Sequence, residues 1–202
     1  MTSTPDSSTP TSAETRPAAR GAATAVLGRW WPALTAALAA ALTVSGGGDG
    51  GGLVFLLFTL PVMYLAIAVL DRPWTSWLMV GAVTALYFLL EAAGVVAWPV
   101  VLGLGVVLVA VGLVRGPLRR PGVFALQIPA LVVFGVAGLL ALAMSAQAAV
   151  AVVALGLLAH ATWDAVHWWT RKVISRSLAE WCMVYDTAVG AAILVILLIR
   201  SF

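Results

Sequence analysis

Long apolar segments, separated by short polar connections, fill nearly all of the chain after residue 21. A helix that crosses a bilayer needs about 20 mostly apolar residues, because its backbone must satisfy its own hydrogen bonds inside lipid. Segments of this kind cover residues 23–45, 52–70, 75–92, 97–114, 122–144, 147–169 and 178–199. The sequence therefore predicts an all-α integral membrane protein, a bundle of about seven transmembrane helices that forms one domain over residues 22–202.

Composition excludes a soluble globular protein. Only 9% of the residues are charged and 62% are hydrophobic, whereas soluble domains carry about 25% charged residues. Residues 1–21 differ from the rest, because they are rich in Ser, Thr and Pro with almost nothing to bury, and we expect a disordered cytoplasmic tail there. The net charge of +3 comes from residues beside the predicted helix ends. It therefore indicates the lipid bilayer of the cell membrane as the partner and not nucleic acid.

The distribution of basic residues predicts the orientation of the bundle. On the side of the amino terminus lie ten of them: Arg16, Arg20, Arg29, Arg72, Arg115, Arg119, Arg120, Arg171, Lys172 and Arg176. The opposite side carries only Arg200. Because short cytoplasmic loops are enriched in Lys and Arg, the amino terminus is predicted to be cytoplasmic and the carboxyl terminus outside. The short connections also predict that successive helices are antiparallel neighbours.

Ionisable residues inside membrane helices are costly, so each is a candidate for function. Both histidines of the chain, His160 and His167, fall in the sixth predicted helix together with Asp164. At about 100° per residue these three side chains lie within about 60° of one another and form one stripe. In the seventh helix, Asp186 is expected at roughly the same depth, about 10 Å from the cytoplasmic surface. Gly156 and Gly190 are expected to let the two helices approach closely there.

We expect His160, Asp164 and Asp186 to be the catalytic residues. The aromatic and polar side chains that are expected to reach the same level, and thus to bind substrate, are Trp163, His167, Tyr185, Tyr64 and Trp181. His167 lies nearer the headgroups, and exposure to water there is an equally good interpretation of it. Gln127 of the fifth helix is a further polar group at this level.

Three chemical interpretations remain open for the cluster. An imidazole beside a carboxylate can transfer a proton near neutral pH, and nearby tryptophans can stabilise a cationic intermediate. This favours isomerisation or cyclisation of a lipid or isoprenoid, with the site opening to the inner leaflet. A metal-dependent lipid hydrolase is another interpretation, in which one adjacent His/Asp pair of the stripe binds zinc with Asp186 as third ligand. The spacing along the stripe itself suits a pair of ligands, so we expect no metal and no other cofactor. The main alternative to the isoprenoid enzyme is a transport, binding or assembly protein in which the cluster relays protons or holds helices.

The size and seven-helix layout resemble two groups of membrane enzymes, the small integral-membrane terpene cyclases and the seven-helix ceramidase and progestin-receptor hydrolases. The second group carries two histidines four residues apart on its last helix, and this motif is absent here. The first group matches through an acidic residue of the final helix, Asp186. That resemblance implies an enzyme acting on an isoprenoid, and it assigns no further residue roles.

Overall fold

The computed structural model describes the backbone of residues 16–46 and 50–200. The chain divides into two compact units, residues 1–31 and residues 32–202. The predicted tail, residues 1–21, lies outside the described residues as far as residue 15, and a helix begins at Arg16. The helix packing and the candidate site belong to the second unit.

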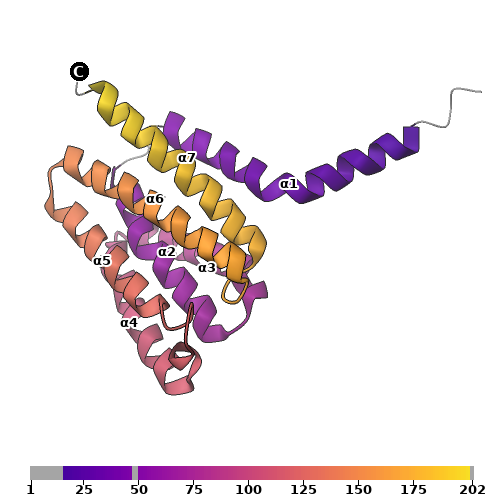
Figure 1. Cartoon of the computed structure of the whole chain (residues 1–202). Helices are drawn as coiled ribbons and strands as arrows, with labels where there is room; N and C mark the ends of the chain where they lie inside the picture. The colour runs from indigo at the N-terminus through magenta and orange to yellow at the C-terminus, as the bar shows by residue number, and fades with distance from the viewer. Residues whose placement is uncertain (1–15, 47–49, 201–202) are drawn as a thin grey trace, which may run out of the picture. The chain divides into compact units, whose positions relative to one another are not determined.

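The described residues form helices and no strands. The helices are α1 (Arg16–Ser45), α2 (Gly50–Leu70), α3 (Ser76–Ala92), α4 (Ala97–Arg115), α5 (Gln127–Ala143), α6 (Ala146–Thr170) and α7 (Arg176–Arg200), with short 3-10 turns η1 (Pro73–Thr75) and η2 (Pro117–Arg119). The all-helical prediction is thus confirmed. Figure 1 shows α6 and α7 lying side by side as a hairpin, with α5 along the other flank of α6.

Six helices are long and apolar enough to cross a membrane, which fits a multi-pass membrane protein. The six segments are Gly52–Leu70, Pro73–Ala92, Ala97–Arg115, Gly122–Ala143, Ala146–Thr170 and Arg176–Arg200. The first predicted span, residues 23–45, lies within α1 and is not among the six found in the described residues. A seventh span and the orientation of the termini stay predictions.

The centre of the second unit is α2, which packs against α3, α4, α5 and α6. In contrast, α3 touches α4 only slightly, and α4 touches α5 only slightly. Small residues explain why α2 takes this place. An added Cβ at Gly112 of α4 would lie 2.8 Å from Val69 of α2, and one at Gly138 of α5 would lie 2.5 Å from the ring of Phe58 of α2. The prediction that all successive helices are close neighbours is therefore incomplete, because short loops fix helix ends while glycines decide where helix axes approach.

The closest approach of α6 and α7 lies at Gly190. A Cβ at this position would lie 2.9 Å from the backbone oxygen of Ala154. Gly156, which the sequence places beside it, instead faces α2, where a Cβ would lie 2.5 Å from Leu57. Both glycines allow close packing, but only Gly190 serves the α6–α7 contact.

We predict that Gly190→Ala lowers stability while Gly103→Ala does not. The Gly190 methyl would meet a backbone atom that cannot rotate away, and overpacking of this kind costs about 1–3 kcal/mol. At Gly103 of α4 nothing lies within 4 Å of the added Cβ. The measurement is thermal unfolding in detergent. Equal melting temperatures for the two variants would mean that α6 and α7 are not closely packed at this point.

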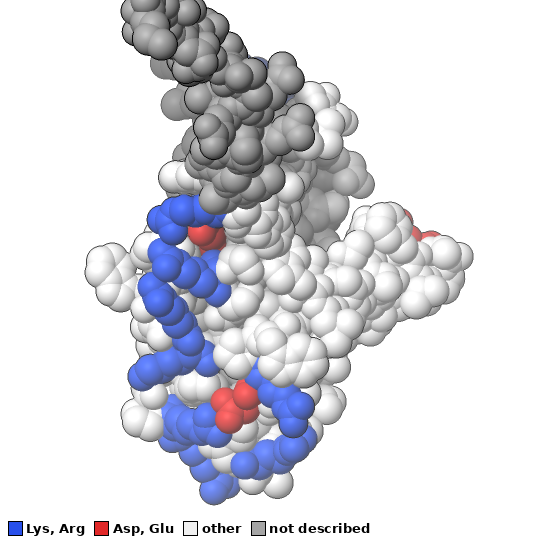
Figure 2. All heavy atoms as spheres, turned by 90° about the vertical axis from the view of Figure 1, so that its right-hand side faces the viewer, with Lys and Arg blue, Asp and Glu red and all other residues white. Residues whose placement is uncertain are grey.

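Three loops meet at one end of the second unit. Arg120 of the α4–α5 connection donates two hydrogen bonds to Asp71 of the α2–α3 connection, at 2.9 and 2.6 Å. These bonds hold the pKa of the Asp71 carboxyl below its ordinary value. The backbone N–H of Ser175, between α6 and α7, donates to the hydroxyl of Ser76 at 2.9 Å. Figure 2 shows Lys and Arg gathered on one side of the described surface, with few acidic groups among them.

Candidate functional site

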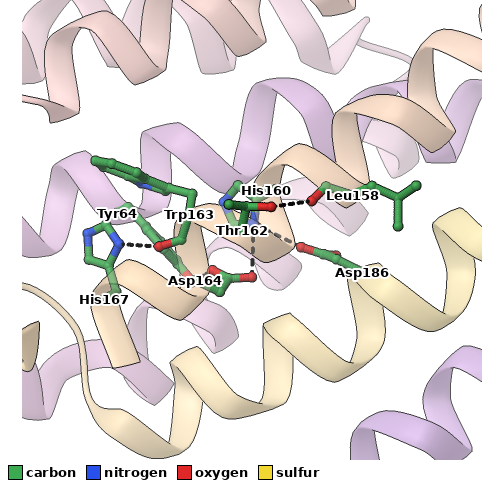
Figure 3. Close-up of polar contacts among 8 residues, drawn as sticks. All are labelled: Tyr64, Leu158, His160, Thr162, Trp163, Asp164, His167 and Asp186. Carbon is green, nitrogen blue, oxygen red and sulfur yellow. Dashed lines mark hydrogen bonds and ion pairs between the residues drawn. The ribbon is translucent and has the colours of Figure 1, made fainter. Parts of the chain in front are cut away.

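The site begins with the predicted stripe on α6. His160, Asp164 and His167 are each 0% exposed and lie on one face of the helix. The interpretation of His167 as a solvated residue near the headgroups is wrong, because neighbouring helices cover it. Figure 3 shows the three side chains following one another along α6.

Asp186 of α7 completes a group of three ionisable side chains. The Nδ1 atom of His160 lies 2.8 Å from Oδ2 of Asp186 and 3.2 Å from Oδ2 of Asp164 (Figure 3). Asp186 is 1% exposed, so all three groups are removed from solvent. The structure therefore brings together His160, Asp164 and Asp186, which the sequence had placed on one level. We call these three residues the His–Asp cluster.

Tyr64 of α2 ties the cluster to the central helix. Its hydroxyl donates to Oδ1 of Asp164 at 2.5 Å, and the Tyr64 side chain is fully buried. Its ring centroid lies 5.1 Å from those of both His160 and His167. The role expected for Tyr64 was contact with substrate, whereas its hydroxyl is engaged by Asp164. Tyr64 thus fixes one carboxylate oxygen and leaves the other turned toward His160.

His167 belongs to a second network, next to the cluster. Its Nδ1 lies 2.9 Å from the carbonyl oxygen of Trp163, and its Nε2 lies 3.0 Å from the amide nitrogen of Gln127. A carbonyl only accepts, so Nδ1 carries the proton; an amide nitrogen only donates, so Nε2 accepts. The Gln127 amide also donates to the carbonyl of Val123 at 2.8 Å. His167 is therefore held as a neutral imidazole whose two nitrogens are both occupied.

The remaining predicted binding residues divide between two places. The Trp163 ring packs against His167 with centroids 4.6 Å apart. Tyr185, in contrast, shares a 3.0 Å hydrogen bond with Thr43 of α1, and Trp181 stacks on it with centroids 5.1 Å apart. Trp163 and Tyr64 thus adjoin the two histidines, whereas the hydroxyl of Tyr185 and the ring of Trp181 belong to a separate aromatic group.

Three further side chains contribute to the site, and of these the sequence had named only Gln127, as a polar group at the same level. Phe134 of α5 packs edge-on to His160 at 5.3 Å between centroids, and Gln127 orients His167. The buried thiol of Cys182 lies against Tyr64. Gln127 carried a signal, as an amide in an apolar segment. Phe134 and Cys182 carried none, because an aromatic ring or a thiol in a membrane helix is ordinary core.

Cavities lie near the cluster without reaching it. One has a volume of about 560 Å³ and runs along α7 beside Val189 and Ile193. A smaller groove of about 300 Å³ lies between α5 and α6, and Phe134 and Trp163 line it. Neither of these two cavities is lined by His160, Asp164 or Asp186. Phe134 lines the groove between α5 and α6 and also contacts His160.

Comparison of the chain with protein-family models, with curated proteins and with solved structures found no match.

Proposed function

We propose that the chain is a membrane-embedded enzyme that acts on a lipid or isoprenoid substrate by proton transfer at the His–Asp cluster. The observation that carries this proposal is the His160 imidazole, whose Nδ1 faces two carboxylates in an environment closed to water. Burying ionisable groups inside a membrane costs free energy, so residues at such positions commonly serve a function. Isomerisation or cyclisation is the class of reaction that such a site suits.

The two ring nitrogens of His160 have different roles in the proposed proton transfer. Nδ1 lies 2.8 Å from Oδ2 of Asp186, so it carries a proton and donates a hydrogen bond to that carboxylate, while Oδ2 of Asp164 lies 3.2 Å from the same nitrogen. Nε2 has no hydrogen-bond partner among the described residues. It is therefore the atom free to take a proton from a substrate or return one. The carboxylates stabilise the imidazolium that forms when it does so, as an aspartate does beside a catalytic histidine.

The groove between α5 and α6 is the proposed place for the hydrocarbon. Its lining is almost entirely apolar, and Leu126 and Val133 at its margin are 46% and 63% exposed, which suits a surface that meets lipid chains. It lies near the start of α5 and the end of α6, which is the end that carries the basic loops. With these loops in the cytoplasm, the groove opens toward the inner leaflet. A rotation of Phe134 would connect it to His160.

Asp164→Asn tests the proposal. The amide oxygen of Asn still accepts the Tyr64 hydrogen bond, but the neutral side chain no longer stabilises an imidazolium. Turnover is expected to be lost while the protein stays folded.

The proposal includes seven spans, with the amino terminus in the cytoplasm and the carboxyl terminus outside. A phosphatase reporter fused after Phe202 is expected to be active, because the phosphatase needs an oxidising compartment. The same reporter inserted in the Arg115–Pro121 loop is expected to be silent. The basic residues of the three loops supply the physical reason. A reporter that is silent at both positions would place the carboxyl terminus in the cytoplasm with the loop. With a cytoplasmic amino terminus, the number of spans would then be even.

A second candidate is non-enzymatic. The bonds from Tyr64 through Asp164 and His160 to Asp186 join α2, α6 and α7, and this favours a structural network in an assembly or transport protein. Both candidates predict that loss of His160 destabilises the fold. They differ for Asp164→Asn, which leaves the network largely in place and removes only the chemistry.

A further inference from the structure

We propose that the His–Asp cluster binds one divalent transition metal ion of the zinc class, through Nδ1 of His160 and one oxygen each of Asp164 and Asp186. The ligand atoms of these three residues lie within 4.8 Å of one another. From the sequence, one adjacent pair of the stripe plus Asp186 was a credible ligand set, although no metal was expected. The structure brings the ligand atoms of His160, Asp164 and Asp186 together.

The spacing of the ligand atoms fits a tetrahedral site. Zinc bonds to His nitrogen and carboxylate oxygen are about 2.0–2.1 Å long, so neighbouring ligands of a tetrahedral ion lie about 3.3 Å apart. The two separations from Nδ1 of His160 are 2.8 Å to Asp186 and 3.2 Å to Asp164. An outward shift of a few tenths of an ångström would open room for the ion between three residues that are already arranged around it.

One of the proposed ligand atoms has no hydrogen-bond partner. Oδ2 of Asp164 is buried and makes no hydrogen bond, although it lies 3.2 Å from Nδ1 of His160. The other oxygen of the same carboxylate accepts the Tyr64 hydroxyl at 2.5 Å. Hydrogen bonds of this kind commonly orient the carboxylates that ligate metals. Nε2 of His160, which has no hydrogen-bond partner among the described residues, would carry the proton once Nδ1 binds the ion. The imidazole itself packs against the rings of Tyr64 and Phe134, with centroids 5.1 and 5.3 Å away.

The charge of the cluster also favours the binding of a cation. When both carboxylates are ionised, the cluster is net negative whether the imidazole is neutral or protonated, and the only ion pairs of the two aspartates among the described residues are with His160. Uncompensated buried charge is costly. A divalent ion would bring two carboxylates and a neutral imidazole to zero net charge.

The ligand set selects the class of ion. One imidazole and two carboxylates suit zinc and similar transition metals, whereas calcium and magnesium prefer oxygen-only sites with more ligands. Three protein ligands leave one position open, which is typical of catalytic zinc and not of structural zinc. Water bound there ionises near neutral pH. The proton-handling role would then pass from His160 to that water, at the same site as the proposed function.

The test is elemental analysis of the full-length protein, purified in detergent without chelator from cells supplied with zinc. We expect about one transition metal ion per chain, and at least a tenfold loss in His160→Gln and in Asp186→Asn, both of which keep side-chain volume. The matched controls are His167→Gln, a buried histidine outside the cluster, and Glu180→Gln, a carboxylate on the same helix as Asp186. Both controls are expected to retain the metal.

A second readout covers the possibility that a variant fails to fold. Cobalt(II) added to chelator-treated wild-type protein is expected to give the intense visible absorption of a tetrahedral site and to raise the melting temperature. Wild-type protein that holds no metal and gives no cobalt spectrum would overturn the proposal, as would equal metal content in the cluster variants and the controls. Neither readout uses a substrate, so metal binding and the enzymatic proposal fail separately.

Discussion

His160→Ala is expected to destabilise the folded protein by about 3–5 kcal/mol, the cost of removing one partner of a buried ion pair. The substitution deletes the group that faces both Asp164 and Asp186, each at most 1% exposed. It leaves two carboxylates side by side without a counter-charge. The measurement is thermal unfolding in detergent, with a melting temperature well below that of the wild type as the expected result.

His167→Ala is the matched control for this prediction. It removes an equally buried imidazole, but one that makes neutral hydrogen bonds to the Trp163 carbonyl and the Gln127 amide. The loss of such bonds costs about 1–3 kcal/mol. The double variant His160→Ala with Asp186→Ala should be less destabilised than the sum of its single changes, because it also removes one stranded carboxylate. Equal melting temperatures for His160→Ala and His167→Ala would contradict the central role of His160.

Asp164→Asn is expected to reduce turnover by at least a hundredfold, the lower end of what a positioned acid–base group contributes. Asn is nearly isosteric with Asp, so Tyr64 keeps its acceptor and the contact between α2 and α6 survives. The negative charge that supports a protonated His160, or that ligates a metal, is lost. The melting temperature should therefore stay close to that of the wild type while product disappears.

The control for this second prediction is Gln127→Glu, which places a carboxylate beside His167 and leaves the His–Asp cluster unchanged. This substitution is combined with Asp164→Asn in one protein. If activity requires a negative charge at position 164 in particular, the double variant will be as inactive as Asp164→Asn alone. Turnover that survives Asp164→Asn would show that the cluster holds helices together and does no chemistry.

Apolar segment length was sufficient to predict the helical class and most of the helix boundaries. The predicted segment 97–114 corresponds to α4 (Ala97–Arg115), and 147–169 to α6 (Ala146–Thr170). Segment 122–144 was too long for one helix, since a turn occupies the residues before Gln127. The central position of α2 was not predictable, because it depends on which glycines face which neighbouring helix. A helix that is apolar on all faces has no sequence pattern that shows which face packs against which neighbour.

For the site, helical periodicity placed His160, Asp164 and His167 on one face, and loop length brought Asp186 level with them. Periodicity gives no information about how far a side chain reaches or what occupies its polar atoms. It could not separate Tyr64, which bonds Asp164, from Tyr185, which bonds Thr43. It also could not show that Gln127 and the Trp163 carbonyl occupy both nitrogens of His167.

Chemistry by the His–Asp cluster on a lipid or isoprenoid can be tested by mass spectrometry of lipid extracts. The extracts come from cells that are supplied with isoprenoid precursors and that express wild type, Asp164→Asn or an empty vector. Folded protein is matched between the two expressing strains by size-exclusion chromatography in detergent. We predict at least one lipid or isoprenoid species that differs between wild type and empty vector and that returns to the empty-vector level in Asp164→Asn. A species that differs equally in wild type and Asp164→Asn, or the absence of any difference from the empty vector, would contradict the claim.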